Sequence, residues 1–171
     1  IQKNINATNA WGYDLSAACS GFLFALESGA ALIESGRSNK VIVVGADTMS
    51  SILNFQDRNT CILFGDGAGA VLLEPSEDYG IIDSKLKIDG NGGEYLKMDA
   101  GGSLLPATHE TIDNKLHYIA QDGKTVFKHA VKGMADISYE VANRNNLKGE
   151  DIALFIPHQA NKRIIDATMK K

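Results

Sequence analysis

The sequence predicts an α/β fold with a mainly parallel sheet. Segments with the pattern of strands alternate along the chain with segments of helical period. Apart from a possible β-hairpin around Pro75 to Gly80, the predicted strands alternate with helices, as expected for a mainly parallel sheet. At 171 residues and 44% hydrophobic content, the chain is also large and apolar enough to bury a core.

The first part of the chain is predicted to hold two strands and a long helix between them. Residues 13–17 read as a short strand that runs directly into the helix, and Gly36 ends that helix. Residues 40–45 form a continuous apolar run, as expected for a strand covered on both faces. The apolar stripe of the helix consists of Phe22, Leu26, Ala30 and Ile33.

The middle of the chain is richer in loops. A polar loop at 54–59 and a glycine-rich run at 65–70 precede a predicted strand at 71–73, and apolar alternation predicts another strand at 82–88. Residues 89–118 are glycine-rich and irregular. Loops of this length are more often functional covers than structural connectors.

The last part is predicted to form a helix, a strand and a final helix. The long helix begins near Gly123 and ends at residues 145–146, and residues 153–156 form the strand. Asn161 is expected to cap the final helix. The apolar stripe of the long helix consists of Phe127, Val131, Met134, Ile137 and Val141.

The composition excludes several classes of protein. The formal net charge of −4 gives no global signal for nucleic-acid binding, and no apolar run approaches the roughly 20 residues of a membrane span. No signal-peptide pattern opens the chain, and two cysteines do not make a disulfide framework. The sequence therefore predicts a reduced, soluble, cytoplasmic protein. Because it lacks an initiator Met and stops inside a predicted helix, we expect an excerpt of a longer protein.

Cys19 has the surroundings of a nucleophile. It lies among small residues at a predicted strand-to-helix junction, where a substrate can approach. The N-terminus of a helix favours the thiolate and offers N–H groups to a developing oxyanion. The alternative is a small, inert, buried cysteine. Cys61 lies in an apolar run without a helix behind it and is interpreted as a packing residue.

His158 directly follows a predicted strand, at the kind of strand end where α/β folds place reactive groups. Pro157 has a fixed φ and so defines the position of His158 more closely. The alternative is a loop or capping histidine. No role is assigned to the other three histidines, which are His109, His117 and His129.

Three further features of the sequence bear on ligands and partners. The run Gly65-Asp66-Gly67-Ala68-Gly69-Ala70 fits the dinucleotide fingerprint formally, but it leads into a strand rather than opening a helix, which argues against nucleotide binding by this route. No His, Cys or carboxylate group has the spacing of metal ligands, so no metal site is predicted. A local basic cluster beside His158 suits an anionic partner. It consists of Lys162, Arg163, Lys170 and Lys171, with Lys128 and Lys132 on the preceding helix.

Three motifs, in this order and spacing, together resemble the β-ketoacyl-acyl-carrier-protein synthase III family of thiolase-fold condensing enzymes. Ala17-Ala18-Cys19-Ser20-Gly21-Phe22 resembles the nucleophile segment of that family. Phe64-Gly65-Asp66-Gly67-Ala68-Gly69-Ala70 resembles its glycine loop. Pro157-His158-Gln159-Ala160-Asn161, followed by Arg163 and Ile164, resembles its catalytic-histidine and carrier-protein segment. The resemblance covers nearly the whole chain.

The resemblance implies an α/β, thiolase-like, five-layered α-β-α-β-α fold, incomplete at both ends in this chain, and a homodimer. Residues 1–78 would be the second part of the N-terminal half, with the nucleophile, and residues 79–171 the first part of the C-terminal half, with the catalytic histidine. The family's catalytic asparagine would lie beyond residue 171. We therefore expect that residues 1–171 alone do not condense substrates.

The resemblance also implies roles for individual residues. Cys19 would be the nucleophile and His158 the second catalytic residue. Arg58 would pack on the adenine of coenzyme A, and Phe64 and Phe127 would line the pocket near the nucleophile. The carrier-protein-binding residues would be Gln159, Ala160, Asn161, Lys162, Arg163 and Lys128. Asn59 stands where the family often has Gly, so the details of the coenzyme contact are open.

The implied reaction starts type II fatty acid biosynthesis. An acyl-CoA primer acylates Cys19, and malonyl-acyl carrier protein then decarboxylates and attacks the acyl group in a Claisen condensation. Coenzyme A thioesters are substrates, and no bound cofactor is implied. The alternatives are an acyltransferase of secondary metabolism, an HMG-CoA synthase-like enzyme, a cysteine hydrolase, and a non-catalytic α/β interaction module.

Overall fold

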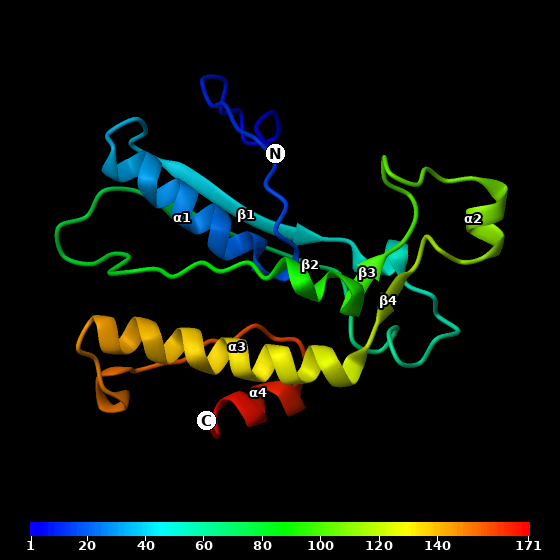
Figure 1. Cartoon of the computed structure of the whole chain (residues 1–171). Coiled ribbons are helices and arrows are strands. Elements are labelled where there is room, and N and C mark those ends of the chain that lie inside the picture. Colours follow the sequence, from blue (N-terminus) through cyan, green and yellow to red (C-terminus); the bar gives the residue numbers. More distant parts are fainter. The chain divides into compact units, whose positions relative to one another are not determined.

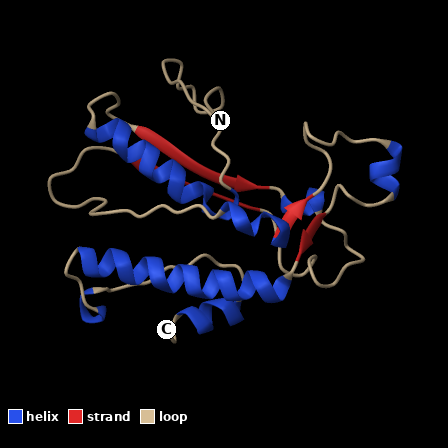
Figure 2. Cartoon of the chain, in the orientation of Figure 1, coloured by secondary structure: helices blue, strands red, loops and turns tan.

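The computed structural model describes all 171 residues and divides them into two compact units. Unit 1 comprises residues 1–45 and 70–79, and unit 2 comprises residues 46–69 and 80–171. Helices and short strands occur in both, as the α/β prediction requires (Figures 1 and 2). Each unit is described by itself.

Unit 1 is built on helix α1 (Gly21–Glu34), which lies along strand β1 (Val41–Asp47) (Figure 1). Strand β2 (Gly67–Leu73) pairs with β1. Residues 41–45 of β1 and 70–73 of β2 belong to unit 1, and the remaining residues of both strands are assigned to unit 2. The second strand was predicted at 71–73, but it already begins at Gly67, so it includes most of the glycine-rich run 65–70. The helix and the strand at 41–47 confirm the sequence prediction to within one or two residues.

The backbone just after α1 shows why Gly36 stops the helix, whose last residue is Glu34. The N–H of Gly36 donates to the carbonyl of Ile33 at 2.9 Å, and the N–H of Arg37 donates to Leu32 at 3.1 Å. This pair of bonds needs a left-handed residue after the helix, and Gly36 has a φ of 70°. Glycine takes that conformation without the steric cost that other residues meet.

Unit 2 contains the longest helix, α3 (Gly123–Arg144), and the short helix α4 (Lys162–Thr168), which pack against each other (Figure 1). Val131 of α3 and Ile164 of α4 are among its few fully buried apolar side chains. Asp122 caps α3 by accepting from the N–H groups of Lys124 and Thr125. At the other end, Asn146 is left-handed with a φ of 56°, which confirms the predicted end at residues 145–146.

The irregular segment 89–118 contains structure that its sequence did not predict. Strand β3 (Leu96–Met98) pairs antiparallel with β4 (Ile119–Gln121), and helix α2 (His109–Asp113) lies between them in the chain. Each strand is only three residues long, which is too short for alternation to be visible. Four short 3₁₀ helices complete the regular structure: η1 (Ala18–Ser20), η2 (Met49–Ile52), η3 (Gly90–Tyr95) and η4 (Gly149–Asp151).

Several predicted strands are not strands in the structure. Residues 13–17, 82–88 and 153–156 carry no ladder of hydrogen bonds, and no hairpin forms at 75–80 (Figure 2). A strand needs a hydrogen-bonded neighbour as well as an alternating pattern, and none pairs with these segments. Several of their apolar side chains stay exposed, whereas others, such as Leu86 and Phe155, are half-buried. Ile82 is 79% exposed, and Leu154 and Ile156 are each 74% exposed. None of the helices is long and apolar enough to cross a membrane.

Candidate active site

Cys19 is exposed in η1, immediately before α1. The predicted helix N-terminus behind it is therefore present, whereas the predicted strand before it is not. No acidic residue occupies the first turn of α1, so no carboxylate offsets the positive end of the helix dipole there. The arrangement suits an anion such as a thiolate at Cys19. Cys61, half-buried in a series of turns, is not joined to Cys19 in a disulfide.

The backbone beside Cys19 is strained. Ala18 has a φ of 46°, in the left-handed region that residues with a Cβ avoid. The N–H of Ser20 donates to the carbonyl of Ala17 at 3.1 Å, which closes a tight turn around Cys19. Strained backbone of this kind persists where the surrounding structure holds it, and it is common at functional sites.

Helix α1, which carries Cys19 at its start, lies close against β1 and β2 because of one glycine. A Cβ added at Gly29 would lie 2.9 Å from Leu73 Cδ1 and 3.1 Å from Val43 Cγ2. Gly45 of β1 similarly leaves room for the ring of Phe22. These contacts fix the position of the helix, and so of the Cys19 segment, within unit 1.

Arg58 lies in a chain of turns between residues 54 and 63 of unit 2. Its side chain is exposed, and so is that of Asn59. Asp57 precedes Arg58 and accepts a hydrogen bond at 3.0 Å from the N–H of Asn59 and one at 2.9 Å from the hydroxyl of Thr60. These two bonds, of which the one from Asn59 is the larger influence, hold the pKa of Asp57 below its usual value.

A second carboxylate, that of Asp66, fixes the glycine-rich run 65–70 by hydrogen bonds. Asp66 accepts from the hydroxyl of Ser50 at 2.6 Å and from the N–H of Ser50 at 2.7 Å. These bonds lower the pKa of Asp66, with the hydroxyl as the main cause. They join the loop to the start of η2. Phe64, one of the predicted pocket residues, lies half-buried just before the loop, and Phe127 is half-buried on α3.

His158 is exposed in the segment that leads into α4. The N–H of Ala160 donates to the carbonyl of His158 at 3.0 Å, which makes a tight turn after the histidine. Asn161 then caps α4 by accepting from the N–H of Ile164 at 3.0 Å, as predicted. The predicted strand before His158 is absent, so the turn and the cap are what position this side chain.

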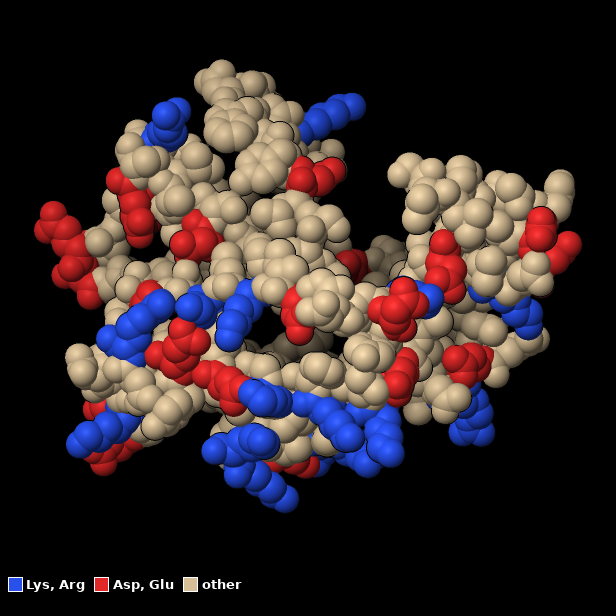
Figure 3. Space-filling model, viewed as in Figure 1, with Lys and Arg blue, Asp and Glu red and all other residues tan.

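Lys and Arg side chains gather over α3 and α4 (Figure 3). Two of these cations are neutralised within their own helix: Lys162 bonds to Asp166 at 2.9 Å, and Lys132 pairs with Asp136. Arg163, Lys128, Lys170 and Lys171 form no ion pair. The exposed Gln159 and the half-buried Ala160 lie just before this surface. The basic surface is therefore carried mainly by Arg163, Lys128 and the last two lysines.

The candidate residues are divided between the units. Cys19 belongs to unit 1, whereas Arg58, Phe64, Phe127, Lys128 and residues 158–163 belong to unit 2. No cluster of three or more His, Cys, Asp or Glu side chains is arranged to hold a metal ion. Sequence reasoning missed Asp57 and Asp66 as the groups that hold the Arg58 turn and the glycine loop. The sequence does carry a signal for Asp57, because Asn59 and Thr60 follow it two and three residues later. This pattern is typical of a turn that an Asp side chain stabilises.

Comparison with protein-family models gives two matches. Residues 13–90 match the model described as 3-oxoacyl-[acyl-carrier-protein] synthase III, and residues 142–171 match the model of the C-terminal part of the same family. Together the two matches cover more than half of the chain. Three of the predicted motifs, around Cys19, Gly67 and His158, fall inside them.

Individual relatives agree with this result. A β-ketoacyl-[acyl-carrier-protein] synthase III of Chlorobaculum tepidum is 59% identical over 174 residues, covering 100% of this chain and 53% of the relative. The synthase III structure from Thermus thermophilus is 37% identical with a TM-score of 0.87, covering 99% of this chain and 51% of that one. The priming β-ketosynthase of the R1128 polyketide pathway is also 37% identical, with a TM-score of 0.85 over 98% of this chain and 49% of that one. The chain thus spans about half the length of the proteins it matches.

Proposed function

The chain belongs to the 3-oxoacyl-[acyl-carrier-protein] synthase III family, and from this premise we propose that it forms part of the condensing enzyme that starts type II fatty acid biosynthesis. The observation that carries the proposal is Cys19, exposed beside the N-terminus of a 14-residue helix whose first turn holds no acid. Such a position favours the thiolate form, which is the nucleophilic form of cysteine.

In the first stage, the Cys19 thiolate attacks the carbonyl carbon of an acyl-CoA. The carbon–sulfur bond to coenzyme A breaks, coenzyme A leaves as its thiolate, and the acyl group stays on Cys19 as a thioester. Charge develops on the carbonyl oxygen during the attack, and backbone N–H groups at the start of α1 are suited to stabilise it. Arg58 contacts the adenine of coenzyme A, and Phe64 and Phe127 line the acyl pocket.

In the second stage, malonyl-acyl carrier protein docks on the basic surface of α3 and α4. It loses carbon dioxide, and the resulting enolate attacks the acyl carbon on Cys19. The Cys19 thiolate leaves, and a β-ketoacyl-carrier protein is formed. A proton on the His158 ring donates a hydrogen bond to the enolate oxygen, which stabilises the charge that forms there. The thioesters are substrates, and the chemistry calls for no resident cofactor or metal.

The remaining assignments follow from the same premise. Residues 1–78 belong to the N-terminal half of the condensing fold and residues 79–171 to its C-terminal half, and the whole protein acts as a cytoplasmic homodimer. The exposed apolar side chains of Ile82, Ile88, Leu154 and Ile156 support an architecture in which these residues have neighbours in the whole protein.

A condensation assay on the complete gene product tests the proposal. The protein is mixed with acyl-CoA and malonyl-acyl carrier protein, and the carrier protein is followed by mass spectrometry. We expect β-ketoacyl-carrier protein from wild type and from Cys61→Ala, and none from Cys19→Ala. His158→Ala should still be acylated by acyl-CoA but should form little condensed product. A wild-type protein that forms no β-ketoacyl product with any acyl-CoA would refute the function.

A second candidate function is priming in a secondary-metabolite pathway, favoured by the similarity to the R1128 priming ketosynthase. The same assay separates the two functions when the carrier protein is varied. Condensation only with a polyketide-type carrier protein would favour the second candidate, and condensation with the fatty acid carrier protein would favour the first.

A further inference from the structure

Asp57 is bonded to four donors, two of them through its carboxylate. Its backbone carbonyl accepts from the N–H of Thr60 at 3.3 Å and from the N–H of Cys61 at 3.0 Å. Its side chain accepts from the N–H of Asn59 at 3.0 Å and from the Thr60 hydroxyl at 2.9 Å. Thr60 is only 2% exposed, so its hydroxyl has no access to water as a substitute partner. Asp57 is therefore the centre of this turn.

Arg58 lies inside the turn that Asp57 closes, and its side chain points to solvent. The neighbours on both sides are fixed by the Asp57 bonds, whereas the Arg58 side chain is exposed and forms no ion pair. A guanidinium held on a rigid backbone loses less freedom on binding than one on a mobile loop, and it can stack on an aromatic ring or contact phosphate.

We infer that Asp57 is a positioning residue for the nucleotide end of coenzyme A: it fixes the backbone so that Arg58 meets the adenine ring. The inference rests on the proposed function, because it takes acyl-CoA as the substrate. It goes further in giving the Asp57 carboxylate, which touches no substrate atom itself, a role in recognising one part of that substrate. Removing the carboxylate should weaken only the contact with the nucleotide.

The test compares two acyl donors that differ only in the nucleotide. Acyl-CoA carries it, and the matching acyl-pantetheine thioester does not. In the complete gene product, Asp57→Ala should slow the acylation of Cys19 by acyl-CoA about tenfold, equivalent to the loss of one good contact. Acylation by acyl-pantetheine should stay within about twofold of wild type, because Arg58 has no ring to meet there. Asp57→Asn keeps an oxygen acceptor for the N–H of Asn59 and should restore most of the rate with acyl-CoA.

Asp89 provides a matched control. It accepts from the N–H of Asn91 at the same 3.0 Å, two residues on, but glycine rather than arginine follows it. Asp89→Ala should leave unchanged the rate ratio, which is the rate of acylation by acyl-CoA divided by the rate with acyl-pantetheine. Should Asp57→Ala fail to fold, Thr60→Val removes the hydroxyl donor from the carboxylate and should lower the same ratio.

The outcomes separate the inference from the function beneath it. A rate ratio that falls in Asp57→Ala and in Arg58→Ala, but not in Asp89→Ala, would support the inference. An equal loss with both donors would show that Asp57 is merely structural and would overturn it, while leaving the proposed function intact. A wild type that is acylated equally well by both donors would also overturn it. Only a wild type acylated by neither donor would refute the function as well.

Discussion

At the scale of single residues, Ala18 combines strain with a position next to the candidate nucleophile. Its φ of 46° costs alanine roughly 1 kcal/mol or more relative to ordinary conformations. A side chain branched at Cβ would tolerate this conformation less well still. Glycine would adopt it freely, although the unfolded chain would then gain entropy.

Substitutions at Ala18 are therefore expected to change stability in opposite directions. Ala18→Gly should raise the free energy of unfolding by about 0.5 kcal/mol, and Ala18→Val should lower it by about 2 kcal/mol. Urea unfolding of the complete gene product measures both changes. If Ala18→Val were as stable as wild type, the left-handed conformation at this position would be wrong.

Cys19, His158 and Asp57 show which site residues a sequence can reveal. Cys19 and His158 stand out in the sequence because they are reactive side chains just before predicted helices, although the strands predicted before them are absent from the structure. Asp57 does not, since a carboxylate in a polar loop usually faces solvent, and its four bonds become visible only when the turn is folded. The roles of Cys19 and His158 remain predictions until the acylation and condensation assays are done.

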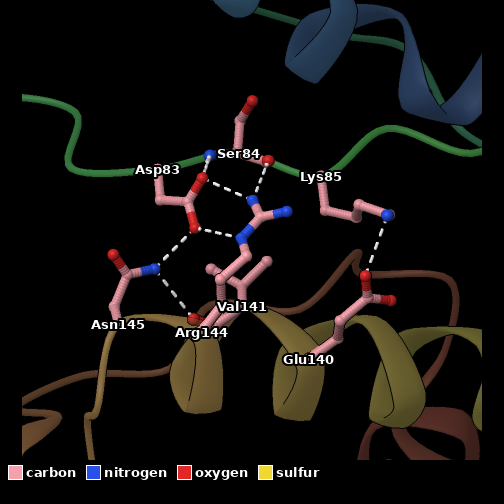
Figure 4. A network of polar contacts seen from close by, with 7 residues as sticks. All are labelled: Asp83, Ser84, Lys85, Glu140, Val141, Arg144 and Asn145. Carbon is pink, nitrogen blue, oxygen red and sulfur yellow. Dashed lines mark hydrogen bonds and ion pairs between the residues drawn. The ribbon is translucent and has the colours of Figure 1, made fainter.

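At the scale of elements, a polar network holds the extended segment after residue 80 against the end of α3 (Figure 4). Arg144 donates to both carboxylate oxygens of Asp83 and to the carbonyl of Ser84 at 2.6 Å. The side chain of Asn145 donates to Asp83 at 2.6 Å. Arg144 above all, and then Asn145, lower the pKa of Asp83 to about 2. Beside it, Lys85 pairs with Glu140 of α3 at 2.8 Å.

The network predicts a specific dependence of stability on pH. Because the pKa of Asp83 is lower in the folded protein than its usual 3.8, its contribution is complete above about pH 4 and is lost as the pH falls towards 2. Asp83→Asn should therefore melt at a lower temperature than wild type at pH 5 to 7, and the difference should shrink below pH 4. Asp78→Asn, in an exposed loop without an ion pair, is the control. A difference that grows as the pH falls would contradict the assignment.

The basic surface of α4 gives a prediction about two neighbouring cations. Lys162 is already bonded to Asp166, whereas Arg163 forms no ion pair. Arg163→Ala should therefore raise the KM for malonyl-acyl carrier protein about tenfold, and Lys162→Ala should raise it much less. Neither change should alter acylation by acyl-CoA. Steady-state kinetics at two salt concentrations measures both effects, and an equal loss in the two variants would argue against the distinction.

Helices were more predictable than strands, for a physical reason. A helix satisfies its hydrogen bonds within itself, so the periodic stripe and the Gly36, Asn146 and Asn161 caps were enough to locate α1, α3 and α4. A strand depends on a neighbour that the sequence does not name. The segments 82–88 and 153–156 have the apolar pattern of strands but no strand beside them to pair with. Strands β3 and β4 pair with each other, although their sequences are too short to show an alternating apolar pattern.

At the scale of the whole molecule, few apolar side chains are fully buried. The fully buried hydrophobic residues are Val43, Leu53, Ala100, Val131 and Ile164. Large apolar side chains stay open to solvent in both units, among them Trp11 at 67% and Leu104 at 98%. A core this small leaves little hydrophobic stabilisation to offset the entropy of folding.

The polypeptide of residues 1–171 by itself should therefore behave differently from the complete gene product. We expect it to bind the dye ANS strongly, to unfold with low cooperativity, and to give no condensation product. Fluorescence with the dye, urea unfolding and the condensation assay measure these properties. A cooperative, dye-silent polypeptide with measurable turnover would contradict the expectation.

Acylation of Cys19 is the most direct test of the central claim. The complete gene product is incubated with acetyl-CoA and with longer acyl-CoA esters, and its intact mass is measured. The account predicts a gain of one acyl group that persists in Cys61→Ala, disappears in Cys19→Ala, and identifies the preferred primer. If no ester acylates the wild-type protein, Cys19 is not the nucleophile of a condensing enzyme.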